Sequence, residues 1–424
     1  MTDRATATKN DIVAALDAAD PLGRFRGHFA FGEPELIYLD GNSLGRMPAA
    51  VPTHIGNLLN TEWGERLIRG WNEGWMELPR RLGAKIAQII GAFEDEVIVA
   101  DSTSVNLYKA ALAACLAQPH RTRIITDNLN FPSDLYVLQG LTTVRSDLEV
   151  VVVPSPDAIH GPTDEIIDLI DDTTALVSLS HAAFKSGFLY DMSAVSAAAR
   201  HHGALTLWDL SHSVGAVPVD VNVVGADLAV GCTYKYLNGG PGAPAFIFVS
   251  RDVPAVLSNP IPGWMGHRSP FTFDRNYTPS IDITRFQTGT PPVIAMSAME
   301  PGVDLVLEAG VDALRAKSIQ QTDMLVRLWA ELLEPRGFTL NSPRQAERRG
   351  SHVSLGHEEG LRIDMALIRE MQVLPDFRAP DNIRLGIAPI YTRFDDILEA
   401  VHRIARVVDE RLFEGYSTNP PAVT

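Results

Sequence analysis

The stretch Gly231–Gly242 (GCTYKYLNGGPG) places a lysine, Lys235, between an apolar run and a glycine-rich loop. The apolar run at 228–230 is typical of a short buried strand. Glycines let the backbone approach a ligand closely, because they carry no side chain. A lysine at such an edge can form a Schiff base with a carbonyl compound. Taken alone, the pattern more often marks a solvated lysine before a turn, so its meaning depends on the rest of the chain.

Upstream of this lysine, predicted strands and helices alternate. Runs rich in Val, Ile and Leu predict strands at 97–100, 123–126, 148–153, 175–180 and 204–208, with another after the lysine at 246–249. Helical spacing predicts helices at about 105–118, 164–170 and 193–201. This alternation predicts an α/β fold with a mostly parallel, doubly wound sheet. After Pro292, a helical stretch at about 295–333, short alternating pieces near 352–355 and a helix at about 395–412 predict a smaller α+β domain.

Two polar groups follow predicted strands of the same sheet. Asp209 stands directly after the strand at 204–208, and the run Asp101–Ser104 (DSTS) lies between a strand and a helix. Ligands of open α/β sheets bind at the carboxyl ends of the strands. A carboxylate there can hold a protonated ring nitrogen, and hydroxyls at a helix start can hold a phosphate. Each group alone is more often an ordinary turn or helix cap.

The three features together match the needs of pyridoxal 5′-phosphate (PLP). The lysine holds the aldehyde, the aspartate keeps the pyridine nitrogen protonated, and the helix start holds the phosphate. The order of phosphate loop, aspartate and lysine along the chain is that of fold-type I PLP enzymes. The sequence therefore predicts a fold-type I PLP-dependent transferase-like fold.

Longer motifs give the chain a specific resemblance. It resembles the kynureninase family, of the class V aminotransferase-like group, over nearly its whole length. The motifs that carry the resemblance are YLDGNSLG (38–45), DSTSVNLYK (101–109), NFPSD (130–134), WDLSHSVG (208–215), YKYLNGGPG (234–242), GWMGH (263–267) and GTPP (289–292).

The resemblance implies roles for individual residues around the cofactor. Lys235 would bind the PLP aldehyde, Asp209 would pair with the pyridine nitrogen, and Tyr234 would contact the phosphate and donate a proton. Phe131 would stack on the ring, with Ser133 and Asp134 bonding around it and His212 beside it. The remaining cofactor positions implied are Thr103, Ser104, Ser180, Trp264, Tyr277 and Thr290, some of them reaching across a dimer interface.

The resemblance also implies a substrate side. Arg384 matches the arginine that binds the substrate α-carboxylate, a role that suits its planar guanidinium, and Arg378 is the nearby competitor. Asn42 and Ser43 match an N-terminal turn on the substrate side, while Trp71 and His267 are candidates for the walls of an aryl pocket. Thr290 stands where other members carry asparagine.

The implied reaction is hydrolytic Cβ–Cγ cleavage of L-kynurenine, or 3-hydroxykynurenine, to anthranilate, or 3-hydroxyanthranilate, and L-alanine, in tryptophan catabolism. The preference between the two substrates stays open. The family also implies a homodimer with shared active sites. The motif order implies a large PLP-binding domain at 61–300 and a small domain built from 1–60 and 301–424.

Composition limits the alternatives. The 424 residues carry a net charge of −16, which counts against nucleic acid or an anionic membrane surface as the main partner. No apolar run approaches the about 18 residues of a membrane span. With two cysteines and no metal-ligand spacing, we expect no metal site and a reducing, cytoplasmic compartment.

Three other readings stay open. The first is another class V PLP enzyme, such as a transaminase or a cysteine desulfurase; a desulfurase needs a mobile nucleophilic cysteine, whereas Cys232 adjoins the lysine loop and Cys115 lies in a predicted helix. The second is a PLP-binding protein without turnover, for which a substrate-carboxylate arginine would be superfluous. The third is a dinucleotide-binding protein, disfavoured because no G-x-G-x-x-G joins a strand to a helix.

Overall fold

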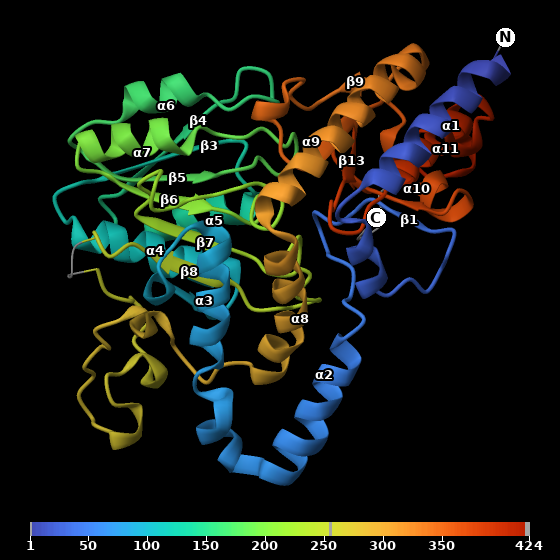
Figure 1. The fold of residues 1–424 in the computed structure, drawn as a ribbon. Coiled ribbons are helices and arrows are strands. Elements are labelled where there is room, and N and C mark those ends of the chain that lie inside the picture. Colours follow the sequence, from blue (N-terminus) through green and yellow to red (C-terminus); the bar gives the residue numbers. More distant parts are fainter. Residues whose placement is uncertain (1, 254–256, 420–424) are drawn as a thin grey trace.

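The computed structural model describes residues 2–253 and 257–419 (Figure 1). Residue 1 and residues 420–424, the outermost ends of the expected small domain, lie outside the described residues, as do residues 254–256 of the expected large domain. Within the described part of the chain, no helix is both long enough and apolar enough to cross a membrane.

The larger sheet has seven strands. Their order across the sheet is β2 (Val97–Val99), β8 (Phe246–Val249), β7 (Leu228–Gly231), β6 (Leu205–Asp209), β5 (Thr174–Ser180), β3 (Arg123–Asp127) and β4 (Glu149–Val153). All neighbouring pairs are parallel except those of β8, which runs antiparallel to β7 and to β2. The prediction of a mostly parallel α/β sheet is confirmed.

Helices cover both faces of this sheet. On one face, α4 (Thr103–Ala117) contacts β5 to β8 and α5 (Pro132–Leu141); the other helices around the sheet are α3 (Leu78–Ile90), α6 (Thr163–Leu169), α7 (Met192–His201) and α8 (Val293–Ala309). Strand side chains alternate between two cores. Val97 and Val99 pack with Leu82 of α3, whereas Ile98 packs with Leu107 of α4. Apolar residues are therefore needed at every position of these strands, which explains their uninterrupted apolar runs.

A smaller sheet lies on the other side of α9 (Figure 1). Its antiparallel strands are β12 (Asp376–Arg378), β13 (Asn382–Gly386), β10 (His352–Gly356) and β9 (Thr339–Leu340). The helices in this region are α1 (Thr2–Ala19), α9 (Val311–Leu328), α10 (Gly360–Glu370) and α11 (Phe394–Asp409). β1 (Ile37–Tyr38) pairs in parallel with β11 (Val373–Leu374), and α1 contacts α11. The two ends of the chain are thus joined through backbone hydrogen bonds and helix packing.

Two local predictions need correction. The helical stretch at about 295–333 is not one helix, because Gly310 adopts φ +77° between α8 and α9 and turns the chain there. Beyond α9 the helix widens over Trp329–Leu333. The helix α5 was not expected from apolar spacing, since its first turn carries the polar NFPSD motif. Short helical turns make up further connections: Gly23–His28, Glu94–Glu96, Trp264–Gly266, Pro270–Thr272, Ile283–Phe286, Glu334–Arg336, Ala346–Arg348 and Leu412–Gly415.

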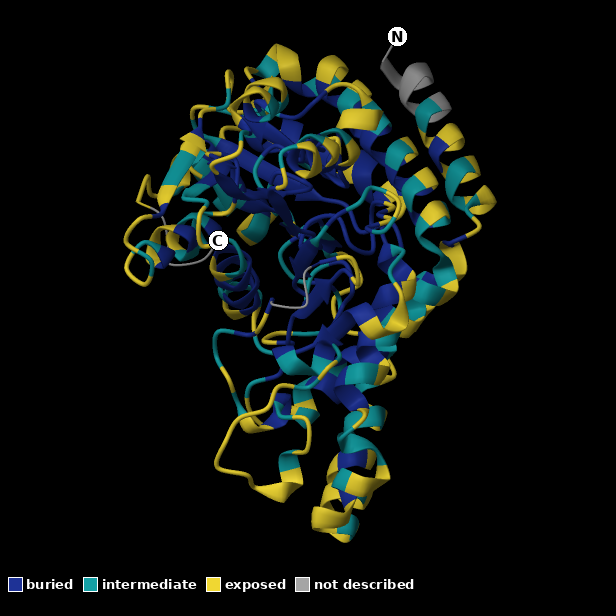
Figure 2. Cartoon of the chain, turned by 90° about the vertical axis from the view of Figure 1, so that its left-hand side faces the viewer, coloured by how far each residue is buried: buried dark blue, intermediate teal, exposed yellow. Residues whose placement is uncertain are grey.

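A helical arm projects from the body between the first strand and the larger sheet. It begins with α2 (Val51–Asn57), continues through Leu58–Arg66, Leu67–Arg69 and Trp71–Trp75, and returns in α3. In Figure 1 the arm extends below the body, and Figure 2 shows its tip largely exposed. Large apolar side chains on the arm face solvent, among them Leu59, Trp63, Leu67 and Ile68. This surface has no partner within the described chain.

Candidate active site

A cavity of about 210 Å³ opens at the carboxyl ends of the strands of the larger sheet. It draws residues from the N-terminal turn, the larger sheet and the smaller sheet. Its lining residues are Asn42, Ser43, Thr103, Ser104, Phe131, Ser133, Asp134, Asp209, Ser211, His212, Tyr234, Lys235, Arg378 and Arg384. The structure thus brings together most of the residues singled out in the sequence, although they are spread over more than 340 positions of the chain.

Lys235 follows β7 and reaches into this cavity. Its Nζ lies 3.1 Å from Nε2 of His212 and 5.9 Å from the ring centre of Tyr234. The N-terminal turn comes very close to the lysine backbone, because the N–H of Gly45 donates to the carbonyl of Tyr234 at 2.7 Å. A Cβ on Gly45 would lie 2.3 Å from the carbonyl oxygen of Lys235. Only glycine therefore allows the N-terminal segment to close this side of the site.

Two buried carboxyl groups lie in the same cavity. Asp209 ends β6, and its Oδ1 accepts the backbone N–H of Ser211 at 2.9 Å. Burial raises the pKa of Asp209, while the nearby Lys235 opposes the rise. Burial and the charge of Asp209 also raise the pKa of Asp134, whose Oδ2 has no hydrogen-bond partner in the described chain. Lys235 is the positive group that acts on both carboxyls, and a protonated pyridine nitrogen would supply a second one.

Another part of the cavity lining is formed by hydroxyls at a helix start. Thr103 and Ser104 open α4, and the Ser104 hydroxyl lies 2.8 Å from that of Ser133 at the start of α5. The fully buried Lys109 stabilises the turn before α4, because its Nζ donates to Asp101 at 2.6 Å and to the carbonyl of Phe286 at 2.7 Å. Hydroxyls, free backbone N–H groups and the helix dipole make this end suitable for a phosphate.

A partly exposed aromatic ring also lines the cavity. Phe131 is 42% exposed although it lies at the junction of a buried strand and α5. Its ring is held edge-on by Phe184 at 5.2 Å between centres. A fixed ring with a free face is suited to stacking on an aromatic cofactor.

The substrate side is formed by the N-terminal turn and the smaller sheet. Arg384 is 2% exposed and bonds to Asp376 and to Ser43. Asn42 is fully buried, and both polar atoms of its amide lack a partner among the described residues. It packs so closely on Gly386 that a Cβ there would lie 1.7 Å from its Oδ1. Both Arg384 and its competitor Arg378 line the cavity.

Several predicted site residues do not line this cavity within one chain. Ser180 lies beside Asp209 in the β5–β6 register but is not among the lining residues, and its backbone N–H donates to Oδ1 of Asn130. Trp71 stacks edge-on with Trp75 on the arm. The others lie in the segment between β8 and α8: Trp264, His267, Tyr277 and Thr290. In this segment the ring of Tyr277 contacts that of His267, and the side chains of Trp264 and Tyr277 are each about two-fifths exposed.

Three residues of the site region were not found from the sequence. Ser211 lies inside the WDLSHSVG motif and could have been noticed between Asp209 and His212. His352 of β10 stands 5.8 Å from the His212 ring, is fully buried and has no partner on either ring nitrogen in the described chain. Asp376 bonds to both arginines. The last two carry no motif, so only the folded chain reveals them.

Comparison with known proteins decides the family. A model of the kynureninase C-terminal domain matches residues 314–404. A kynureninase of Pseudomonas fluorescens is 42% identical over 410 residues, which are 95% of this chain and 96% of that protein. A kynureninase of Burkholderia mallei is 42% identical over 401 residues, 93% of this chain and 94% of that one. The chain belongs to the kynureninase family. The resemblance seen in the motifs is confirmed.

Solved structures show the fold of this kynureninase family member at lower identity. A cysteine desulfurase of Thermococcus onnurineus has a TM-score of 0.74 at 18% identity, covering 90% of this chain and 96% of that one. The enzyme C-DES, with glycine covalently linked to its PLP, has a TM-score of 0.78 at 17% identity, covering 90% and 98%. These similarities confirm the fold-type I prediction. Family and fold together identify the cofactor as PLP, and the residues of the cavity fit it.

The desulfurase similarity extends to the fold alone. Both cysteines of the chain are buried and free. Burial raises the pKa of the Cys115 thiol to about 12 and also raises the pKa of Cys232. A nucleophilic cysteine needs the opposite, a lowered pKa and access to the substrate. The thiol chemistry of a desulfurase therefore has no suitable residue in this chain.

Proposed function

We propose that the chain cleaves the Cβ–Cγ bond of L-kynurenine, or of 3-hydroxykynurenine, by addition of water, with release of anthranilate, or 3-hydroxyanthranilate, and L-alanine. The observation that carries the proposal is the shared cavity of Lys235, Asp209 and Arg384 in a chain that is 42% identical to kynureninases. In PLP chemistry on an amino acid, Lys235 would supply the amine that binds the cofactor, Asp209 would keep the pyridine ring protonated as an electron sink, and Arg384 would anchor the substrate carboxylate.

Bound PLP supplies an electrophilic carbon for the substrate amine and a conjugated ring that takes up the electrons of the Cα–H bond. In the proposal, Nζ of Lys235 carries the proton away from Cα, which requires that it be uncharged at that moment. The neutral His212 at 3.1 Å offers a hydrogen-bonding partner without adding a second positive charge.

The other side chains would orient the cofactor and the substrate and would protonate the substrate β-carbon. Asp209 would hold the pyridinium N–H of bound PLP, and that positive charge would keep its carboxyl ionised against the effect of burial. The neighbouring Cys232, and after it burial, raise the pKa of Tyr234, so its hydroxyl remains a proton donor throughout the working range. We assign it the protonation of the substrate β-carbon. Arg384 would bind the α-carboxylate and so fix the amino acid backbone.

In the deciding experiment, purified, PLP-loaded protein is incubated with L-kynurenine and the products are measured. Anthranilate, followed by its fluorescence, and L-alanine should appear in equal amounts. L-Cysteine and amino-group acceptors serve as parallel substrates: alanine with sulfide, or transfer of the amine without carbon–carbon cleavage, in place of anthranilate would favour a desulfurase or a transaminase. PLP binding without any turnover would favour a binding protein. Comparison of kynurenine with 3-hydroxykynurenine decides the preferred substrate.

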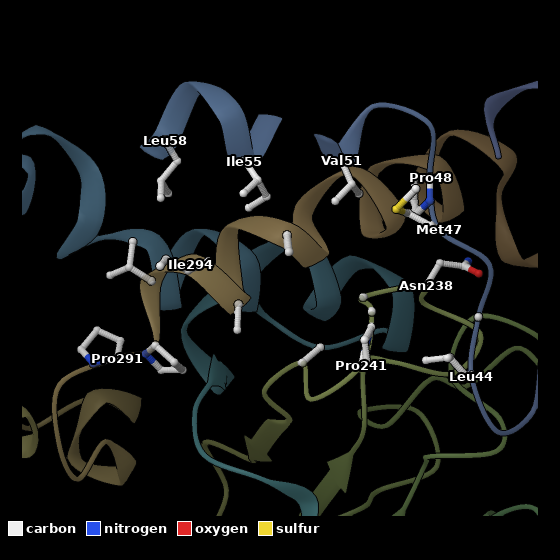
Figure 3. Close-up of a pocket in the computed structure, with 18 of the residues that line it drawn as sticks. Leu44, Met47, Pro48, Val51, Ile55, Leu58, Asn238, Pro241, Pro291 and Ile294 are labelled. Atoms are coloured by element: carbon white, nitrogen blue, oxygen red, sulfur yellow. The ribbon is translucent and has the colours of Figure 1, made fainter. Parts of the chain in front are cut away.

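We further propose that two copies form a homodimer with shared sites. A groove of about 880 Å³ runs between the N-terminal segment with α2 and the start of α8 (Figure 3). Its lining is almost wholly apolar and includes Met47, Val51, Ile55, Leu58 and Ile294. It also includes the loop that follows Lys235, so it adjoins the active-site cavity. A second copy seated there could bring Trp264, Tyr277 and Thr290, which lie outside the cavity of a single chain, towards it.

Three further assignments accompany the proposal: the domain boundaries, the metabolic role and the cellular location. We propose a PLP-binding domain at 61–300 and a small domain from 1–60 and 301–424, supported by the β1–β11 pairing that unites both chain ends. We propose a role in tryptophan catabolism through the kynurenine pathway, which follows from the substrate. We propose a cytoplasmic location, supported by two free, buried cysteines.

A further inference from the structure

Strand register brings three charged residues onto one face of the smaller sheet. Asp376 of β12 lies directly opposite Arg384 of β13 in the antiparallel ladder. Arg378 is two residues beyond Asp376 on β12 and therefore points to the same face. Side chains of directly opposed residues approach each other closely. The strand register alone thus places Asp376 next to both arginines on one face of the sheet.

Asp376 binds both arginines and the N-terminal turn. Its Oδ1 accepts Nε–H of Arg384 at 2.7 Å, and its Oδ2 accepts an Nη2–H of the same guanidinium. Oδ2 also lies 2.6 Å from Nη2 of Arg378 and accepts the hydroxyl of Ser43 at 2.8 Å. The side chains of Asp376 and Arg384 are only 3% and 2% exposed. One carboxylate therefore connects three residues that line the cavity.

These contacts leave Arg384 little freedom. The bidentate bond to Asp376 sets the plane of the guanidinium. Nη2 also bonds to Ser43 Oγ at 3.0 Å, and Nη1 donates to the carbonyl of Phe184. A long arginine side chain otherwise loses considerable rotamer entropy when it binds a ligand. Here that ordering is already present before a substrate arrives.

The charges of the group suit an incoming anion. Burial by itself would raise the pKa of Asp376, but its bonds to Arg384 and the charges of both arginines hold that pKa below the ordinary value. The ionised Asp376 offsets one of the two positive charges of Arg384 and Arg378. The remaining positive charge has no counterpart unless Asp40 or Asp364 ionises, and burial together with the charge of Asp376 raises the pKa of both. A substrate carboxylate would complete the balance.

We propose that Asp376 is a positioning residue for substrate recognition, which joins Arg384 and Arg378 into one guanidinium pair that binds the α-carboxylate. The inference rests on the proposed function, because it takes the ligand to be an α-amino acid. It assigns Arg378 a share in carboxylate binding beside Arg384. Asp376 itself does not touch the substrate.

The test compares L-kynurenine with its α-carboxamide, which is uncharged at that position. In the PLP-loaded wild type, the acid should have the higher kcat/KM. In Asp376→Asn, the ratio of the two kcat/KM values should fall about 10-fold or more, through KM rather than kcat, with PLP still bound. A merely structural role would lower both values equally, so an unchanged ratio overturns the inference.

A second variant guards against poor folding of the first. Arg378 is about one-third exposed, so Arg378→Gln should fold, and it should also lower the acid-to-amide ratio. Asp409→Asn, which breaks the exposed pair with Arg336, is the matched control and should keep the wild-type ratio. If Arg378→Gln keeps that ratio as well, the guanidinium pair is rejected. If the wild type itself releases no anthranilate, the proposed function fails instead.

Discussion

Nζ of Lys235 lies 3.1 Å from Nε2 of His212, inside a pocket that excludes solvent from the imidazole. Burial, and after it the charge of Lys235, lowers the pKa of His212 well below its ordinary value. The histidine is therefore neutral at working pH and can only exchange hydrogen bonds with the lysine. In the proposed function, the proton that leaves the substrate is therefore assigned to Lys235.

Replacement of Lys235 tests its covalent role. Lys235→Ala should lose at least about 10³-fold in kcat, because both the covalent anchor and the base are removed. Borohydride reduction followed by peptide mass analysis should find PLP attached at Lys235 in the wild type and nowhere in the variant. Lys9→Ala, at a side chain that pairs with Glu331 and does not line the cavity, is the control and should keep both the label and activity. A label that persists in Lys235→Ala would remove the lysine from this role.

The neutrality of His212 can be tested through pH. Because the folded-state pKa lies far below the ordinary value, His212 should not titrate between about pH 6 and pH 8. The variant His212→Gln should lower kcat but keep the shape of the wild-type pH profile over that range. Loss of an acidic limb in His212→Gln would show that the histidine does change its charge.

Substitution of Arg384 by lysine tests the fork-shaped contact. Lysine keeps the positive charge but cannot bind Asp376 through two parallel bonds. We expect KM for kynurenine to rise about 10-fold or more and the protein to lose about 3 kcal/mol, since a buried carboxylate is left poorly paired. Steady-state kinetics and urea unfolding measure the two effects. A wild-type KM in Arg384→Lys would exclude this arginine from carboxylate binding.

Asp364 should make stability depend on pH. It is fully buried in α10, and neither side-chain oxygen has a hydrogen-bond partner in the described chain. Burial, and then the charges of Asp376 and Asp40, raises its pKa to about 8. Unfolding would return that pKa to about 3.9. The folded chain holds the extra proton between these values, so stability should fall as pH rises from about 4 to about 8.

The variant Asp364→Asn removes this titration. Its Tm relative to the wild type should increase between about pH 5 and pH 8, by about 1 °C for each kcal/mol of relative stabilisation in a chain of this length. Thermal melts across this range measure it. Asp172→Asn, at a side chain that is 93% exposed, should track the wild type at every pH. If the Asp364→Asn and wild-type curves stay parallel, Asp364 is ionised in the folded protein.

The apolar groove predicts the assembly state. A charge in its wall, Ile55→Asp, should shift the protein from dimer to monomer, because a buried unpaired carboxylate opposes association. Activity should fall with dissociation if the partner completes the site. Analytical ultracentrifugation and anthranilate release measure both. Val223→Asp, at an 80% exposed apolar residue outside the groove, should remain dimeric and active. A monomeric wild type would contradict the proposal.

The fold could be predicted because its signals are local. Each strand of the larger sheet is buried on both faces and appears as an apolar run, and β5 to β7 were placed within a residue or two. The break at Gly310 was missed, since a glycine between two helical patterns also fits a continuous helix until its φ is known. Residues near strand ends, such as Asp209 and Lys235, could be found because the apolar run of the preceding strand marks where that strand ends.

By itself, the sequence determined the family, the cofactor chemistry and the side chains placed by strand ends and helix starts, because these depend on short, contiguous patterns. The tertiary structure alone decided which distant groups meet. Ser43 reaches Asp376 across 333 positions, and His352 comes to lie beside His212. Such contacts follow from how the two sheets and the N-terminal turn close on one another, and no local pattern records that closure.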